Sequence, residues 1–358
     1  MTRKEELNKL VLTICKPTYN RKLVLIPDIL DYLSVEDSRF QIKVNDNRST
    51  DGTVEELSKI QDSRLIFHVN EGNEGALFNF VSALKDSKSA YILLLIDKDT
   101  LDVKLLSRFI DYLQNEKPNF GYIDLSNDKP IHEVVYEKGV QSVLHSAYLS
   151  KHPSGFFWKT ELFENEISKP YFKELQSDFD FPYDLLNGYL GARYSCTVMY
   201  WPLIINETMR VDEDKMPKTK SYNNDNFFFG KKKIRMTYCA YLNNMYKTEL
   251  SERDKRYIAS NLTHDAIVKS STGLRKLLQR KNVCYHYNLK MRKVSFLEMV
   301  GNTIDILKDY RLLTKDKLSF LFYAKSAAIL FIESLFRISA VCIKEVIIKP
   351  KQEPIKAG

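Results

Sequence analysis

The first hundred residues alternate short, unbroken apolar runs with amphipathic stretches, and this alternation restricts the possible fold more than any other feature. An apolar run without polar interruption is buried on both faces, which is typical of strands in a parallel sheet covered by helices. We therefore predict an α/β fold with a mostly parallel central sheet and helices on both faces. The predicted strands are Val11–Cys15, Gln41–Val44, Leu65–Val69 and Tyr91–Ile96, and the predicted helices are Leu23–Leu33, Val54–Ile60 and Ala76–Leu84.

A polar cluster follows each predicted strand. These clusters are Pro17–Arg21, Asn45–Thr53, Asn70–Gly75 and Asp97–Asp99. In open parallel sheets, ligands bind beyond the carboxyl ends of the strands, where such loops meet. Each loop alone could be ordinary turn chemistry, but four of them on one edge of a sheet predict a ligand site.

The pair Asp97 and Asp99 closes the last of these strands, with Lys98 between them. Alternate side chains of a strand share a face, so we expect both carboxylates to point the same way. Two nearby carboxylates repel each other unless a cation lies with them, and oxygen ligands suit Mg²⁺ or Mn²⁺. The alternative is a strand end with two solvated acids.

The ordered segments KPTYNR, NDNRSTDGT, NEGNEGALFN and YILLLIDKD resemble the family 2 glycosyltransferases, which have a GT-A fold. The resemblance covers about the first hundred residues and weakens after residue 120. It implies a nucleotide-sugar donor, UDP-linked by default, a divalent Mn²⁺ or Mg²⁺ at Asp97 and Asp99, and inversion at the anomeric carbon. The implied donor-binding residues are Pro17, Thr18, Tyr19, Asn20, Asp46, Asn47, Asn73, Gly75, Asn79, Asp97 and Lys98, with Asp99 as the more direct metal ligand.

Inverting transfer needs a general base that takes the proton of the acceptor hydroxyl. Members of the family supply an acid that opens a helix in the second half of the domain. Here Asp184 precedes an apolar run and is the first candidate, with Asp180 and then Asp178 as alternatives; each could instead cap a helix. The segment from His145 to Trp158 resembles the acceptor side of these enzymes, where the expected contacts are His152, Ser154, Gly155 and Trp158.

The character of the chain changes near residue 221. We predict a GT-A domain over residues 1–220, with a nucleotide-binding half (1–100) and an acceptor-side half (101–220), followed by a helical region over residues 221–358. Residues 317–348 form the most apolar stretch, interrupted by Lys325, Glu333, Arg337 and Lys344 on one narrow stripe. Such a helix packs into protein or lies in a membrane interface, and it can also support a homo-oligomer.

The chain has 54 Lys and Arg against 46 Asp and Glu, a net charge of +8 that favours anionic partners. Five scattered cysteines and an N-terminus without an apolar core indicate a reduced, cytoplasmic protein. The expected enzyme works at the inner face of the cell membrane, transferring sugar to a lipid-linked or oligosaccharide acceptor in cell-surface polysaccharide synthesis, and nucleic acid is not an expected partner. The alternatives are a sugar nucleotidyltransferase and a non-catalytic basic protein that binds membrane or nucleic acid.

Overall fold

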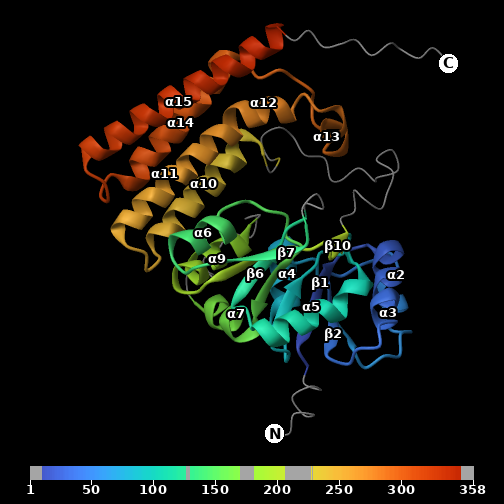
Figure 1. The fold of residues 1–358 in the computed structure, drawn as a ribbon. Coiled ribbons are helices and arrows are strands. Elements are labelled where there is room, and N and C mark those ends of the chain that lie inside the picture. The colour runs from blue at the N-terminus through green and yellow to red at the C-terminus, as the bar shows by residue number, and fades with distance from the viewer. Residues whose placement is uncertain (1–9, 126–129, 170–180, 206–226, 228, 348–358) are drawn as a thin grey trace, which may run out of the picture. The chain divides into compact units, whose positions relative to one another are not determined.

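The computed structural model describes residues 10–125, 130–169, 181–205, 227 and 229–347 (Figure 1). It divides into two compact units, one formed by residues 1–214 with 244–254 and the other by residues 215–243 with 255–358. The first unit thus includes a short segment from farther along the chain.

The first unit is built on an eight-stranded sheet with the strand order β3-β2-β1-β4-β8-β6-β9-β7. The strands β1, β2, β3 and β4 are parallel, whereas β8 runs antiparallel to both β4 and β6. The predicted α/β class with a mostly parallel sheet is confirmed. The bounds are β1 (Leu12–Thr18), β2 (Phe40–Asp46), β3 (Leu65–Val69), β4 (Tyr91–Leu94), β6 (Phe120–Ile123), β7 (His132–Tyr136), β8 (Phe156–Lys159) and β9 (Cys196–Tyr200). A separate two-stranded sheet pairs β5 (Thr100–Leu101) with β10 (Ile204–Ile205).

The helices of this unit connect the strands. They are α2 (Lys22–Leu33), α3 (Thr53–Leu57), α4 (Ala76–Leu84), α5 (Val103–Glu116), α6 (Val140–Ser146), α7 (Thr160–Ile167) and α9 (Pro182–Arg193). The apolar side chains of α2 and α5 join those of β1, β2 and β4 in one buried cluster. The apolar periodicity of the sequence therefore placed the elements of the first hundred residues correctly, with ends that differ by a few residues.

The predicted end of the fourth strand, at Ile96, is wrong. Strand β4 stops at Leu94, and Asp97 and Lys98 form a turn rather than continuing the strand. The backbone amide of Ile96 donates to the side chain of Ser154 instead of to a neighbouring strand. Asp97 and Asp99 are therefore placed by a turn, and the alternation of a strand does not decide where they point.

The second unit is helical in the part that the structure describes. Its helices are α10 (Lys231–Tyr246) and α11 (Glu252–Val268), which each extend into the first unit by a few residues, a π-helical turn (Lys269–Gly273), α12 (Leu274–Leu277), α13 (Lys281–His286), α14 (Phe296–Thr314) and α15 (Phe320–Ile347). Met299 of α14 and Ile338 of α15 share a buried cluster with Leu274 and Leu278. By length and composition alone, the segment Phe320–Lys344 of α15 could cross a membrane, and only 17% of its most apolar window is buried.

Candidate functional site

The four polar loops predicted from the sequence meet at one edge of the sheet. Thr18 lies opposite Asp46 in the pairing of β1 with β2, and the backbone amide of Asn70 donates to the carbonyl of Asp46. The fourth loop joins them through Asp97, whose Oδ2 accepts hydrogen bonds from the Thr18 hydroxyl (3.0 Å) and from the backbone amide of Tyr19 (3.3 Å). The carboxyl edge of β1, β2 and β4 thus gathers the predicted donor-binding residues.

Neighbouring groups partly offset the effect that burial has on the pKa of Asp97. Burial raises the pKa of this carboxyl, and the positive charges of Arg21 and Lys16 and the hydroxyl of Thr18 oppose that shift. Arg21 and Lys16 therefore help Asp97 to keep its negative charge.

Asp99 connects the turn after β4 to the predicted acceptor-side segment. Its side chain is fully buried, and its Oδ2 lies 2.5 Å from Nε2 of His152 and accepts a 2.5 Å hydrogen bond from the hydroxyl of Ser154. His152 retains about a quarter of its side-chain exposure (27%) and so faces the solvent side of this contact. The structure therefore brings together Asp99, His152 and Ser154, which the sequence assigned to two different roles.

A buried ion pair that the sequence analysis missed supports the same turn. Lys16 of β1 and Asp28 of α2 are both almost fully buried, and Lys16 Nζ lies 3.7 Å from Asp28 Oδ2. The same ammonium donates a 2.8 Å hydrogen bond to the backbone carbonyl of Asp99. A lysine inside an apolar strand was the available signal, because an ammonium in a strand core needs a partner.

Five asparagines form a network beneath the loop that precedes α4. The Asn45 amide donates to Asn79 Oδ1 (2.7 Å) and Asn70 Oδ1 (3.0 Å), and the Asn70 amide donates to Asn47 Oδ1 (2.9 Å). Asn47 in turn donates to Asn73 Oδ1 (2.9 Å), and Asn79 donates to the carbonyl of Thr18 (3.2 Å). The predicted contacts Asn47, Asn73 and Asn79 thus hold the loop onto β1 and β2. The sequence analysis did not single out Asn45 and Asn70.

Two acids of the second loop are also used locally. Asp46 accepts hydrogen bonds from the amide (2.7 Å) and hydroxyl (2.5 Å) of Ser49, which turns the chain after β2. Asp51 accepts from the amides of Lys22 (2.9 Å) and Thr53 (3.1 Å), so it ties the starts of α2 and α3 together. These contacts hold the second loop in place. They thereby also fix the position of Asp46, one of the predicted donor contacts.

The remaining predicted donor contacts surround the same edge. Pro17 is buried in β1, whereas Tyr19 is exposed, and Lys98 is half-buried in the turn. Asn20 has a positive φ of 54°, and its Oδ1 accepts from the amide of Thr50 (2.7 Å). Gly75 has a φ of +85° at the start of α4, a conformation that glycine adopts without strain.

Asp184 lies in the first turn of α9 with its side chain fully buried. Its Oδ2 accepts a 2.8 Å hydrogen bond from the backbone amide of Ser150, two residues before His152. Burial raises the pKa of Tyr122, and the charges of Asp124, Asp99 and Asp184 raise it further. Asp178 and Asp180, the other candidates for a base, lie outside the described residues.

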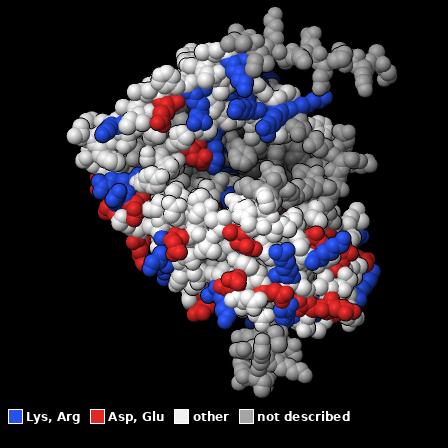
Figure 2. Space-filling view, in the orientation of Figure 1, with Lys and Arg blue, Asp and Glu red and all other residues white. Residues whose placement is uncertain are grey.

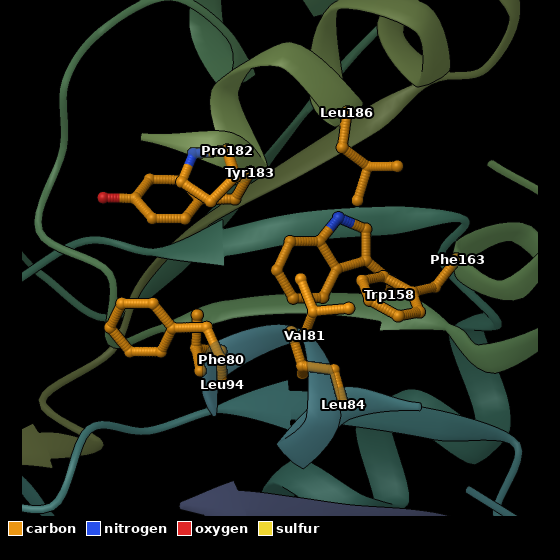
Figure 3. A pocket seen from close by; sticks show the side chains of 9 residues that line it. All are labelled: Phe80, Val81, Leu84, Leu94, Trp158, Phe163, Pro182, Tyr183 and Leu186. Atoms are coloured by element: carbon orange, nitrogen blue, oxygen red, sulfur yellow. The ribbon is translucent and has the colours of Figure 1, made fainter. Parts of the chain in front are cut away.

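Trp158 does not have the exposed position that a sugar-stacking role requires. It lies in β8 with no exposed surface, and its indole N–H donates to Asn187 Oδ1 (2.8 Å). Figure 3 shows its ring against Val81, Leu84 and Phe163 in an apolar pocket. The prediction that Trp158 contacts the acceptor is therefore corrected. The lining of the pocket is completed by Phe80, Leu94, Pro182, Tyr183 and Leu186.

Gly155 has a structural reason to be glycine. Its φ is +106°, and a Cβ at this position would lie 2.8 Å from the carbonyl oxygen of Ile123. Its amide donates to the carbonyl of Leu94, the last residue of β4. Gly155 thus lets the segment carrying His152 and Ser154 approach the end of β4 closely.

The described residues fit a divalent cation only if a bound nucleotide supplies further coordinating oxygens. Within residues 10–125, 130–169, 181–205 and 229–347, no three or more His, Cys, Asp or Glu side chains are grouped so that they could hold a metal ion. Asp97 and Asp99 place two carboxylates in one turn, and oxygen ligands of this kind suit Mn²⁺ or Mg²⁺. Phosphate oxygens of a bound nucleotide would have to complete the coordination.

Comparison with known proteins agrees with this geometry. Residues 13–177 match the model of glycosyl transferase family 2. A curated Escherichia coli protein, UDP-Glc:alpha-D-GlcNAc-diphosphoundecaprenol beta-1,3-glucosyltransferase WfaP, is 31% identical over 112 residues. This match covers 31% of the chain and 45% of that protein, so the chain spans less than half the length of this relative.

Solved structures of TarS from S. aureus share the fold at low sequence identity. The complex of TarS residues 1–349 with UDP-GlcNAc aligns with a TM-score of 0.55 and 14% identity, covering 93% of this chain and 92% of that one. A longer TarS structure also gives a TM-score of 0.55, at 15% identity, and covers 92% of this chain but only 55% of that one. Residues 13–177, somewhat less than half of the chain, thus resemble a glycosyl transferase family 2 domain, and the chain shares the GT-A-like fold of these structures.

Proposed function

We propose that the protein is a glycosyltransferase that moves a sugar from a nucleotide-diphosphate donor, by default a UDP-sugar, to a glycan acceptor. The observation that supports this most directly is the contact of Asp99 with His152 and Ser154. It joins the turn at the end of β4, on the donor side, to the segment expected on the acceptor side. The match to glycosyl transferase family 2 covers both of these segments.

The donor would lie over the carboxyl edge of β1, β2 and β4. Thr18, Tyr19 and Asp46 are the proposed contacts for the nucleoside, and the asparagine network would hold the adjoining loop in place. Arg21, whose charge acts on Asp97, is the proposed source of positive charge near the diphosphate. One TarS structure was solved with UDP and another with UDP-GlcNAc, which supports a uridine donor as the first to be tested.

Asp99 and Asp97 are the proposed carboxylates for Mn²⁺ or Mg²⁺. When bound, such an ion would neutralise charge on the departing diphosphate, which is largely an electrostatic task. The contribution of the chain would be to hold the two carboxylates in a fixed turn. Lys16 secures the backbone of that turn, and Thr18 and Ser154 orient the carboxylates of Asp97 and Asp99 respectively.

Transfer with inversion is proposed from the family and needs a base close to the acceptor hydroxyl. Asp184 has no exposed side-chain surface, and it binds the amide of Ser150. Its position therefore supports a role in placing the segment that carries His152, which would leave Asp180 to take the proton. His152, which keeps part of its side-chain exposure, remains the proposed contact on the acceptor side. Ser154 is fully buried, and its hydroxyl holds the carboxylate of Asp99.

The proposed acceptor is a lipid-linked glycan in cell-surface polysaccharide synthesis, at the cytoplasmic face of the membrane. WfaP is named for a diphosphoundecaprenol-linked acceptor, and its match to this chain supports the proposal. The helical second unit is the part of the chain through which any homo-oligomer is proposed to form.

A thermal-shift panel tests the proposed donor. The full chain is melted with UDP-, GDP-, CDP- and TDP-sugars, each with Mn²⁺ or with EDTA. We expect one nucleotide series to raise the melting temperature in the presence of Mn²⁺, because a ligand at 100 times its dissociation constant stabilises the folded state by about 2.7 kcal/mol. The lack of a shift with every donor, at saturating concentrations, would contradict the proposed function.

The base is tested by comparing Asp180→Asn with Asp184→Asn in a transfer assay. If Asp180 takes the proton, Asp180→Asn lowers kcat by about a hundredfold or more while the melting temperature stays the same. Asp184→Asn keeps an oxygen to accept from Ser150 and is expected to change kcat less. A larger loss of kcat for Asp184→Asn, at unchanged melting temperature, would instead identify Asp184 as the base.

A further inference from the structure

One side of α15, opposite the side that packs on α14, is an exposed apolar surface. Helix α15 turns Leu330, Ser334 and Ile338 inward, and the Ser334 hydroxyl lies 2.9 Å from that of Thr303 on α14. At about 100° per residue, the opposite side of α15 carries Leu321, Ile329, Ile332, Phe336 and Ile343. All five are exposed, with Phe336 at 74%.

We call the side of α15 formed by Leu321, Ile329, Ile332, Phe336 and Ile343 the outer face. Scattered apolar residues are normal on a protein surface, but a series that follows one side of a long helix marks an interaction surface. On the side shown in Figure 2, the helical unit is mostly white, with more blue than red.

The charges around the outer face are mainly basic. Along α15 and the turn before it, between residues 315 and 344, five exposed residues are basic and two are acidic. The basic residues are Lys315, Lys317, Lys325, Arg337 and Lys344, and the acidic residues are Asp316 and Glu333. Anionic lipid headgroups complement this pattern, since each basic residue near such a surface strengthens binding by about 1 kcal/mol, which is about fivefold.

We propose that the outer face binds an anionic lipid bilayer, with α15 lying in the plane of the headgroups and its apolar residues inserted below them. This inference rests on the membrane association in the proposed function and deepens it by naming the surface and the lipid charge. It does not depend on the identity of the sugar donor.

The position of Lys325 favours a bilayer over a second copy of the chain. Lys325 lies in the middle of the apolar series, at nearly the same helical angle as Ile332 and Phe336. In an apolar protein interface its ammonium would be buried at a cost. At a lipid interface its aliphatic stem can be buried while the ammonium reaches the phosphates.

The packing of α15 favours a helix that lies on the bilayer over one that crosses it. Leu330, Ser334 and Ile338 are already covered by protein. Glu333 and Arg337 lie near the middle of the helix, where a spanning orientation would place charge in the hydrocarbon. In the interface these two residues lie to one side of the inserted residues and can remain at the level of the headgroups.

Flotation of the full chain with vesicles tests the proposal. The vesicles are phosphatidylcholine alone, or phosphatidylcholine with about 30% phosphatidylglycerol, at low and high salt. We expect binding to the anionic vesicles that weakens with salt. Phe336→Asp should weaken binding at least about tenfold. Lys325→Gln combined with Lys344→Gln should weaken it about 30-fold, and Glu333→Gln should strengthen it about fivefold.

Leu30→Asp, at an exposed leucine of α2 in the other unit, is the matched control and should bind like the wild type. Equal flotation of wild type and Phe336→Asp would overturn the proposal. A dimer in sedimentation equilibrium that Phe336→Asp dissociates, with no vesicle binding, would assign the face to a second copy. Retention in the membrane after alkaline extraction would indicate a spanning helix. The thermal-shift panel with nucleotide sugars, run on the same variants, separates these outcomes from a failure of the proposed sugar transfer.

Discussion

Asp99→Asn is expected to reduce sugar transfer by about a hundredfold to a thousandfold while leaving the fold intact. The substitution keeps an oxygen that can accept from Ser154 and removes the negative charge proposed to hold the metal ion. Losing one preorganised electrostatic contact to a reacting group typically has an effect of this size. The measurement is the rate of release of the nucleoside diphosphate at saturating donor and Mn²⁺, with the melting temperature recorded for each sample.

Asp102→Asn is the control for this experiment, since Asp102 is an acid three residues away that caps α5 through the amide of Lys104. Asparagine is an equally good cap, so both activity and stability should persist. The Mn²⁺ dependence of donor binding should also disappear in Asp99→Asn and remain in Asp102→Asn. Turnover near the wild-type rate in Asp99→Asn would refute the proposed role of this carboxylate.

Lys16→Met is expected to lower the free energy of unfolding by about 3–5 kcal/mol, the cost of leaving one partner of a buried pair without the other. The ammonium is fully buried between Asp28 and the carbonyl of Asp99, so its removal leaves both oxygen groups without this donor. Urea denaturation followed by circular dichroism measures the change. Because the same lysine holds the turn of Asp97 and Asp99, donor binding should weaken as well.

The double variant Lys16→Met with Asp28→Leu separates the two effects. Replacing both charges with apolar groups of similar volume should restore much of the lost stability, since neither charge then remains buried alone. Donor binding should stay weaker than in the wild type, because the hydrogen bond to the carbonyl of Asp99 is not restored. A single Lys16→Met variant that loses less than about 1 kcal/mol would show that the pair does not stabilise the fold.

The sequence predicted the first half of the fold well, because the elements there are specified locally. The continuous apolar runs identified β1 to β4, and the predicted bounds of α4 and β3 agree with the structure. The same reasoning failed at the end of β4, where a run that is apolar through Ile96 stops pairing at Leu94. Apolarity records burial, and residues 95 and 96 are buried without belonging to a strand.

The roles of single residues were harder to predict. The histidine at 152 was expected on the acceptor side, and the structure places it against Asp99, 53 positions earlier. Trp158 was expected to contact a sugar, but it lies in the core. The alternation of side chains along β8 indicates which of them are buried only when β8 is known to lie between β4 and β6. An aromatic residue serves equally well in a core and in a sugar site, so its type does not decide between them.

The sequence by itself determined the α/β class, the order of the four polar loops and their common location at the carboxyl edge of a parallel sheet. Periodicity and turn chemistry within about ten residues specify these features. The tertiary structure alone decided what holds that edge together: the Lys16 contact across 83 positions, the asparagine network and the burial of Asp184. Buried polar groups need hydrogen-bond partners, and groups far apart in the sequence become partners only when the chain has folded.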